Sequence, residues 1–330
     1  MTKVRRANTR QFDLVVFGEF FSDMIFYGLR NQPRFGEEVK TESFLIAPGG
    51  GLATAAIAAS RLGSGTGIIT RVGADAEALP TWSEILKEGL DVTACEIRRD
   101  QATALTVSVA YQSNRLMVTH EPINQRLEDL LTHKPVLDKL HKARHVHFAC
   151  ALRHPRRWIP VMKELREDGI TVSADFGWNP DLSPAQLHSI VKYCEFIFPN
   201  ENEAKAITGA SDALRALERL KDWVRVPVVK LGKRGAMLIA ESKLYRQPAL
   251  PIAIVDATGA GDAFDGGFLH AFLHGADWNE CLIAGNICGS LSASQPGGSQ
   301  GLPNAKEYRH HFAAMRSNGL QRRKKTATEY

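Results

Sequence analysis

The residues with the clearest chemical pattern are 256–264, which read Asp-Ala-Thr-Gly-Ala-Gly-Asp-Ala-Phe. They follow an apolar run, Ala249 to Val255, that we expect to be a strand, and from Phe264 they lead into a helical pattern of apolar residues. The first amides of a helix have no intrahelical partner, so a glycine-rich junction between a strand and a helix can bind an anion. Gly259 and Gly261 lack a Cβ and would let backbone amides come close to that anion.

Asp262 lies in the first turn of the expected helix, beside this anion site. A carboxylate that accepts a hydroxyl proton, next to donors for phosphoryl oxygens, is what phosphoryl transfer to an alcohol requires. The alternative is that the glycines only form a turn and that Asp262 only favours the positive end of the helix dipole, an effect of about 0.3–1 kcal/mol. The spacing alone leaves both interpretations open, because short glycine motifs are weak signals.

The composition is that of a soluble globular protein with a sizeable core: 330 residues, 44% hydrophobic and 23% charged. The net charge is +5, and basic residues gather in two segments, 1–10 and 318–330, that we expect to be solvated tails. No aromatic residues alternate with these basic ones, so we expect no nucleic-acid binding.

The five cysteines contain no C-x-x-C pair, which argues against a zinc site or a disulfide framework. They indicate ordinary thiols in a reducing compartment. The chain begins without an apolar leader, and no apolar run reaches the length of a membrane span. We therefore expect a cytoplasmic protein without a membrane partner.

Strands and helices alternate along most of the chain. This order predicts an α/β fold with a mostly parallel sheet, covered by helices on both faces, in a single domain over 1–330. The expected strands are Phe12–Gly18, Ile68–Val72, Val146–Ala149, Ile170–Ala174, Phe196–Phe198 and Val226–Leu231, and the expected helices include Leu52–Leu62, Glu77–Glu88, Arg157–Glu167, Pro184–Tyr193 and two within Glu201–Val224.

Two polar, loosely alternating segments interrupt this order, Phe35–Ile46 and Thr103–Thr119, the second with a hairpin turn at Ser113-Asn114-Arg115. We interpret them as a small sheet that forms a lid, built from about 20–48 and 98–121. The alternative is a pair of edge strands that extend the main sheet. Unpaired lid strands would be protected by pairing across a two-fold axis, so we expect a homodimer through the lids.

Polar and glycine residues follow the first strand at the end where open α/β sheets bind ligands. Asp23 can accept two substrate hydroxyls, although a turn aspartate is an equal alternative. Gly49 and Gly50 precede an alanine-rich helix and would let the backbone approach a ligand. Thr54, one turn into that helix, can add a hydroxyl, or it can simply pack or cap the helix.

Two further loops carry candidate ligands for a nucleotide and a metal. Asn200 and Glu203 stand three residues apart at the start of a helix, where Glu203 can hold Mg²⁺ through water or can merely cap the helix. Gly232 and Gly235 follow another strand and would hold nucleotide phosphates or ribose, unless they only form a hairpin. Lys230, at the end of that strand, is assigned to the same nucleotide site.

Together these residues resemble the ribokinase-like (PfkB) carbohydrate kinases, over about Asp13 to Pro303. The most specific match is the family signature Asp-Thr-x-Gly-Ala-Gly-Asp, from which residues 256–262 differ only at Ala257. The other matches are Gly49-Gly50 before a helix that ends Arg61-Leu62-Gly63, the Asn-x-x-Glu motif at 200–203, the loop glycines at 232 and 235, and Asn286 near the adenine pocket.

The resemblance implies transfer of the γ-phosphoryl group of ATP, with Mg²⁺, to an alcohol of a sugar or sugar-like compound. It implies that Asp262 takes the hydroxyl proton while the amides of Gly259, Ala260 and Gly261 stabilise the phosphoryl charge. It implies that Asn200 and Glu203 organise Mg²⁺ and the phosphates. The residues that it places under the lid with the acceptor are Asp23, Gly49 and Gly50, where we add Thr54.

The resemblance also implies a monovalent cation such as K⁺ near Asp256 and Gly297-Gly298. Two departures from the family pattern concern the acceptor: Thr54 stands where the family has asparagine, and residues 175–179 match Asp-x-Asn-x-Arg only loosely and lack the arginine. The acceptor therefore need not be ribose.

Two alternatives to a sugar kinase remain. One is a nucleoside kinase, in which Trp178, Phe21, Phe26 or Phe35 would stack on a base. The other is a catalytically silent ligand sensor on the same scaffold, against which the intact Asp262 argues. A dinucleotide-binding oxidoreductase is excluded, because Gly-x-Gly-x-x-Gly does not follow the first strand.

Overall fold

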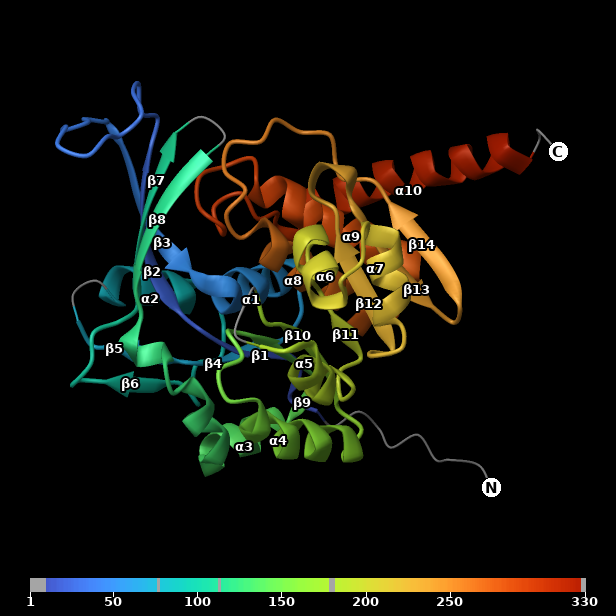
Figure 1. Ribbon diagram of the computed structural model, residues 1–330, viewed down its shortest axis with the longest axis horizontal. Helices are drawn as coiled ribbons and strands as arrows, with labels where there is room; N and C mark the ends of the chain where they lie inside the picture. The colour runs from blue at the N-terminus through green and yellow to red at the C-terminus, as the bar shows by residue number, and fades with distance from the viewer. Residues whose placement is uncertain (1–9, 76–77, 112–113, 178–181, 328–330) are drawn as a thin grey trace.

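The structure is a computed structural model, and it describes residues 10–75, 78–111, 114–177 and 182–327. The predicted tail 1–10 and the final residues 328–330 therefore lie almost wholly outside it. The other predicted tail is not a plain extension of the chain, because α10 (Ala305–Ala327) continues as a helix through most of it. Figure 1 shows this helix leading away from the body of the molecule.

The main sheet has the predicted mostly parallel arrangement. Its strand order is β14-β13-β12-β11-β10-β9-β1-β4, with parallel pairing from β4 to β12 and antiparallel pairing of β13 and β14. The strands are β1 (Phe12–Gly18), β4 (Thr66–Ile69), β9 (Ala143–Ala149), β10 (Thr171–Asp175), β11 (Phe196–Ile197), β12 (Val226–Lys230), β13 (Ala236–Ala240) and β14 (Lys243–Gln247).

Helices cover both faces of this sheet (Figure 1), so its central strands are buried on both sides, with the hydrogen-bonded polar group of His145, His147 and Ser173 on one face. In β1, Val15 and Phe17 join one core while Leu14 and Val16 join the other. The first core is closed by α3 (Lys134–Leu140), α4 (Pro155–Glu167), α5 (Pro184–Val191), α6 (Glu201–Thr208) and α7 (Ala213–Leu220), and the second by α1 (Gly50–Leu62), α2 (Ala78–Lys87), α8 (Ala260–Leu273) and α9 (Trp278–Ser292).

A separate four-stranded sheet, which we call the lid sheet, has the order β3-β2-β7-β8. Its strands are β2 (Phe21–Tyr27), β3 (Ser43–Gly49), β7 (Leu105–Tyr111) and β8 (Asn114–His120). The alternative of two edge strands on the main sheet was wrong. The two residues between β7 and β8 lie outside the described part of the chain, and Asn114 and Arg115, expected in a turn, belong to β8.

Two predicted elements differ from the structure. The run Ala249–Val255 is not a strand: Pro248 and Pro251 cannot donate to a ladder, and Val255 N donates instead to Ala293 O at the end of α9. In the lid, 35–42 is loop, the end of the predicted segment begins β3, and a further lid strand, β2, lies earlier in the chain. A further small sheet pairs β5 (Arg71–Gly73) with β6 (Glu96–Arg98).

Helix α8 is held at its position by glycines that permit close helix packing. A Cβ at Gly266 would overlap Ala55 O of α1, and a Cβ at Gly267 would come within 2.6 Å of Cys288 Sγ of α9. These contacts fix where the N-terminus of α8 points. No helix in the described ranges is both long and apolar enough to cross a bilayer.

Candidate active site

A cavity of about 410 Å³ lies between the lid sheet and the N-terminus of α8. It brings together all the predicted acceptor and signature-loop residues except Ala260 and Gly261: Asp23, Gly49, Gly50, Thr54, Gly259 and Asp262. The lid sheet contributes further side chains that sequence reasoning did not single out, namely Thr106, Met117, Thr119 and Glu121. We call this space the acceptor cavity.

The signature loop ends at the N-terminus of α8, which begins at Ala260. Gly259 has a φ of +70°, and a Cβ there would lie 2.8 Å from Gly298 Cα, so glycine is required on both counts. No side chain in the described residues caps this terminus. Ala260 N makes only a long hydrogen bond to Ala257 O, at 3.3 Å, so this terminus can present backbone N–H groups to an anion.

Asp256 holds the loop in this shape. Its Oδ1 accepts hydrogen bonds from Thr258 N at 2.9 Å and from Thr258 Oγ1 at 2.6 Å. Its Oδ2 accepts from Gly297 N at 3.1 Å, which ties the signature loop to the loop before Gly298. The lid reaches the same point, because Arg115 donates to Thr258 Oγ1 at 2.5 Å.

Asp262 points into the acceptor cavity from the first turn of α8. Gly51 leaves room for it, since a Cβ there would lie 2.7 Å from Asp262 Oδ1. Burial, with the nearby charges of Asp175 and Glu203, raises the pKa of Asp262 to about 7, against the opposing effect of Lys230. A carboxyl group with a pKa near 7 has the basicity of a general base at neutral pH.

Asp23 faces the same cavity from β2 of the lid sheet, not from a loop after β1. It packs against Gly49, where any Cβ would overlap its carboxylate. Burial and the charge of Asp256 raise the pKa of Asp23 to about 7, despite a hydrogen bond from Thr106. Asp23 is thus placed to accept hydrogen bonds from acceptor hydroxyls.

Lys230 lies against the first turn of α8, outside the lining of the acceptor cavity, and not in the loop with Gly232 and Gly235 that follows Lys230 in the chain. Its ammonium donates to Asp175 Oδ2 at 2.7 Å and to Asp265 Oδ1 at 3.2 Å. A Cβ at Gly261 would lie 3.0 Å from Lys230 Nζ, so the ammonium sits against the first turn of α8. Burial alone would lower the pKa of Lys230, but the charges of Asp175 and Asp265 raise it.

The carboxylates of Asp175, Asp262 and Asp265 have oxygens within 4.8 Å of one another, close enough to share a cation. Lys230 already supplies a positive charge to two of them. Burial alone would raise the pKa of Asp175, but Lys230 lowers it. Burial raises the pKa of Asp265. We therefore assign this cluster to the lysine and not to a metal. Sequence reasoning singled out Asp262, Lys230 and the loose motif at Asp175, but it missed Asp265 and did not predict that these residues meet.

Asn200 and Glu203 form the capping box that was the alternative to metal binding. Asn200 Oδ1 accepts from the amides of residues 202 and 203, and Glu203 Oε2 accepts from Asn200 N at 2.8 Å. Burial and Asp175 raise the pKa of Glu203, and its charge also acts on Asp262. Glu203 therefore lies near Asp262 while also capping α6.

The residues assigned to the nucleotide lie beyond the acceptor cavity, around β13 and α9. Gly232 and Gly235 have φ values of +57° and +86°, and Gly235 packs against the backbone of Gln247. Asn286 is buried in α9, where its Nδ2 donates to Gln247 O at 3.1 Å. These three residues thus shape one region, at the end of β14.

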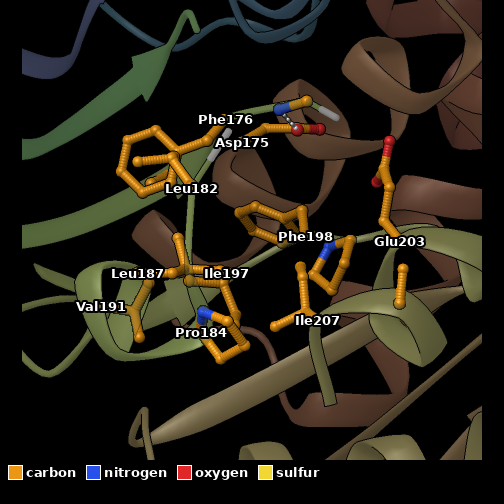
Figure 2. Close-up of a pocket in the computed structure, with 14 residues that line it drawn as sticks. Asp175, Phe176, Leu182, Pro184, Leu187, Val191, Ile197, Phe198, Glu203 and Ile207 are labelled. Atoms are coloured by element: carbon orange, nitrogen blue, oxygen red, sulfur yellow. Dashed lines mark hydrogen bonds between the residues drawn. The ribbon is translucent and has the colours of Figure 1, made fainter. Parts of the chain in front are cut away.

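A second cavity, of about 190 Å³, lies beside Asp175 and Glu203. Figure 2 shows these two carboxylates on one side and apolar side chains, such as Leu187, Val191 and Ile197, gathered on the other. It offers few groups for binding hydroxyls, so we do not assign the acceptor to it. Trp178, a candidate for stacking on a base, lies outside the described residues.

Replacing Gly51 by alanine should lower kcat by about 10²-fold, because the new Cβ would displace the Asp262 carboxylate. Alanine suits a helix, so the thermal midpoint should hardly fall. The measurement is steady-state kinetics with a melting curve. Gly65→Ala, which meets only ordinary contacts, is the matched control. Equal kcat for both variants would contradict this placement of Asp262.

Comparison with known proteins finds kinases among those that this chain resembles. The model of the pfkB family carbohydrate kinases matches residues 11–305. A cytidine kinase of Thermococcus kodakarensis is 28% identical over 244 residues, which cover 72% of this chain and 84% of that protein. A 2-dehydro-3-deoxygluconokinase of Bacillus subtilis is 28% identical over 319 residues, covering 92% of this chain and 97% of that protein.

Solved structures share the fold. The ribokinase of Arabidopsis thaliana, complexed with ribose and ATP, superposes with a TM-score of 0.79 at 23% identity, covering 91% of this chain and 98% of that chain. The chain belongs to the pfkB family of carbohydrate kinases. It is therefore a phosphotransferase with an alcohol group as acceptor, and its fold is the ribokinase-like α/β fold that the sequence predicts.

Proposed function

We propose that this chain transfers the γ-phosphoryl group of ATP to a hydroxyl of a sugar or sugar-like compound, with Asp262 as the base. The observation that carries the proposal is the position of Asp262, which faces the acceptor cavity from the uncapped N-terminus of α8. A proton acceptor and an anion site thus meet at one point. This arrangement is what phosphoryl transfer to an alcohol requires.

The roles of the residues follow from their positions. Asp23 and Thr54 hold acceptor hydroxyls, while Gly49 and Gly50 bring the backbone close to them. Asp262 then accepts the proton of the hydroxyl that attacks. The amides of residues 259–261 donate to the transferring phosphoryl oxygens as negative charge shifts among them.

Mg²⁺ would neutralise phosphate charge and orient the nucleotide when bound. Glu203 lies near Asp262 and offers carboxylate oxygens suited to Mg²⁺, whereas Asn200 Oδ1 already accepts two amides of the cap and would act by holding Glu203 in place. Because Glu203 Oε2 is used by the cap, we propose that Glu203 meets the ion through water. Gly232, Gly235 and Asn286 would shape the nucleotide site, and Lys230 would add positive charge behind the phosphates.

The test is an ATP-consumption assay with Mg²⁺ against a panel of sugars, sugar acids and nucleosides. Turnover that requires both Mg²⁺ and an acceptor supports the proposal. If no acceptor gives turnover but one of them raises thermal stability, the ligand-sensor alternative is favoured instead.

A nucleoside kinase remains the alternative acceptor class, in line with the cytidine kinase among the relatives. Two of the candidate stacking residues do not support it. Phe26 packs on Phe44, with ring centroids 4.9 Å apart, on the face of the lid sheet away from Asp23, and Phe35 is fully exposed. Phe21 alone of the described candidates lines the acceptor cavity.

For K⁺, we propose the loop that Asp256 and Gly297 form together, because their hydrogen bond brings the two predicted neighbours into contact. Dependence of the rate on K⁺ at constant ionic strength would support it. For the location we propose the cytoplasm, because ATP is available there and the described cysteines are all free thiols.

We also propose a homodimer through the lids. The strand register puts a group of apolar residues on the face of the lid sheet away from the acceptor cavity, and several are well exposed, with Phe44 at 47%, Leu116 at 62% and Val118 at 63%. An apolar sheet face of this kind is typical of a protein interface. The group includes Met24, Phe26, Phe44, Ile46, Val107, Val109, Leu116 and Val118.

Replacing Val118 by glutamate should convert the dimer to a monomer, because a charge would be buried in the proposed interface. Sedimentation at micromolar concentration measures this directly. Leu244→Glu, at an exposed apolar position of β14, is the matched control and should stay dimeric. A wild-type protein that sediments only as a monomer would contradict the proposal.

A further inference from the structure

We propose that the acceptor is an uncharged polyhydroxy compound and that this site rejects sugar acids and other anions. The inference rests on the proposed kinase function and names its acceptor class. It comes from the charges in and around the acceptor cavity. The side chains that line the cavity include three carboxylates, Asp23, Glu121 and Asp262, and no lysine, arginine or histidine among the described residues.

In the described part of the chain, the cations Lys230, Arg115 and Arg153 near this cavity are each paired with a carboxylate. Lys230 lies between Asp175 and Asp265, as described above. Arg115 donates to Thr258 and its guanidinium is 3.7 Å from Asp256 Oδ1. Both cations are thus used to hold the signature loop and the first turn of α8.

Arg153 is paired twice. It donates to Glu19 and, through its second amino group, to Glu121 Oε1 at 2.7 Å. It also donates to Asn124 O at 3.3 Å. Because two carboxylates share one guanidinium, the cluster of Arg153, Glu19 and Glu121 carries a net negative charge. Glu121 is the residue of this cluster that lines the cavity.

The remaining polar groups suit alcohols. Thr106 and Thr119 face each other across the lid strands with their hydroxyl oxygens 3.2 Å apart, and Thr54 lines the opposite wall. Hydroxyls can donate to carboxylates and exchange hydrogen bonds with threonines, so an uncharged polyol can satisfy this lining. A nucleoside or a monosaccharide meets this condition equally.

An anionic acceptor would be repelled by the carboxylates of this cavity. A carboxylate about 5 Å from one of these carboxylates, at an effective dielectric constant of about 20, should bind roughly 10²-fold more weakly than its uncharged counterpart. A site for sugar acids would need a free cation, and this cavity presents none among its described side chains. Glu121 is therefore a specificity-determining residue, because it keeps Arg153 from serving as that cation.

The experiment uses the full-length protein and matched pairs of compounds, each an aldose and the aldonic acid derived from it. Two quantities are measured: kcat/KM by ATP consumption, and binding by isothermal calorimetry with ADP and Mg²⁺ present. We expect at least one aldose or nucleoside to bind and react, with its matched acid weaker by about 10²-fold or more.

Glu121→Gln should reduce the ratio of kcat/KM between the aldose and its acid by about tenfold, mainly through a lower KM for the acid. The substitution removes one negative charge and so leaves one amino group of Arg153 without its carboxylate partner. Glu218→Gln, at an exposed position of α7, is the control and should leave the ratio unchanged.

The outcomes separate the inference from the kinase proposal. An acid that binds as well as its aldose, or better, overturns the inference, whether or not phosphoryl transfer occurs. Failure of every uncharged compound to bind overturns it too. Selective binding of uncharged compounds without turnover supports the inference and contradicts the kinase proposal.

Discussion

Replacing Asp262 by asparagine should lower kcat by about 10²–10⁴-fold, the usual contribution of a positioned base. The amide has nearly the same shape, so acceptor binding should change little. The value of kcat falls because asparagine cannot take the hydroxyl proton. Acceptor binding is kept because the side chain still lines the acceptor cavity at the N-terminus of α8. Steady-state kinetics together with calorimetric titration of the acceptor would separate the two effects.

The same variant should be more stable than the wild type at pH 8. Asp262 has a folded-state pKa raised to about 7 from its ordinary value of 3.8, so the folded protein binds more protons than the unfolded chain between these values. Its contribution to the free energy of unfolding therefore falls as pH rises from about 4 to 7. Asparagine removes this unfavourable charge, and we expect a gain of about 1–2 kcal/mol at pH 8.

The wild-type rate should depend on pH in the opposite sense. Activity needs the ionised carboxylate, so kcat/KM should rise as pH increases through about 7, the pKa of Asp262. The wild-type enzyme thus gains activity over the range in which this group loses stability. Near-normal turnover of Asp262→Asn, or a variant that is less stable at pH 8, would contradict the assigned role.

Replacing Lys230 by methionine should have the largest effect on stability. It removes one partner from a buried ion cluster and leaves Asp175 and Asp265 without their counter-charge, which costs about 3–5 kcal/mol in comparable cases. Urea unfolding at pH 8 measures the change. The loss should be smaller at pH 5, where protonation can relieve the uncompensated carboxylates.

Catalysis should respond to Lys230 as well. Lys230 opposes the upward shift in the pKa of Asp262, so its removal should raise that pKa and move the rise of kcat/KM to higher pH. Lys233→Met is the control, since Lys233 is exposed in the next loop. Adding Asp175→Asn to Lys230→Met should restore part of the lost stability. An unchanged pH profile would show that Lys230 has a structural role only.

Much of the fold could be predicted because local patterns report burial. Continuous apolar runs identified β1 and β12, and the alternation with helices placed β9 and β10, whose buried residues include His147 and Ser173. The same reasoning failed at Ala249–Val255, which is apolar but forms no strand. A strand needs a neighbour to pair with, and the edge of the sheet there is β14. Periodicity cannot show which edge is available.

The candidate site, like the fold, has features that the sequence predicts and features that it does not. The glycine spacing in 256–264 predicted the uncapped helix start and the carboxylate beside it, because both are properties of consecutive residues. Asn200 and Glu203 were predicted to share one point, and they do, as a capping box. Local geometry is determined by residues within one helical turn of each other, and the sequence shows these directly.

The sequence by itself therefore determined the alternation of strands and helices, the uncapped start of α8 and the place of Asp262 in its first turn. Only the tertiary structure decided what surrounds that carboxylate. Lys230 meets Asp175 and Asp265 across 55 and 35 residues of chain, and Arg153 meets Glu121 across 32. Such pairs depend on how strands and helices pack side by side, and no local pattern specifies that. The charge of the acceptor cavity, and with it the expected choice of acceptor, is for this reason a property of the folded chain.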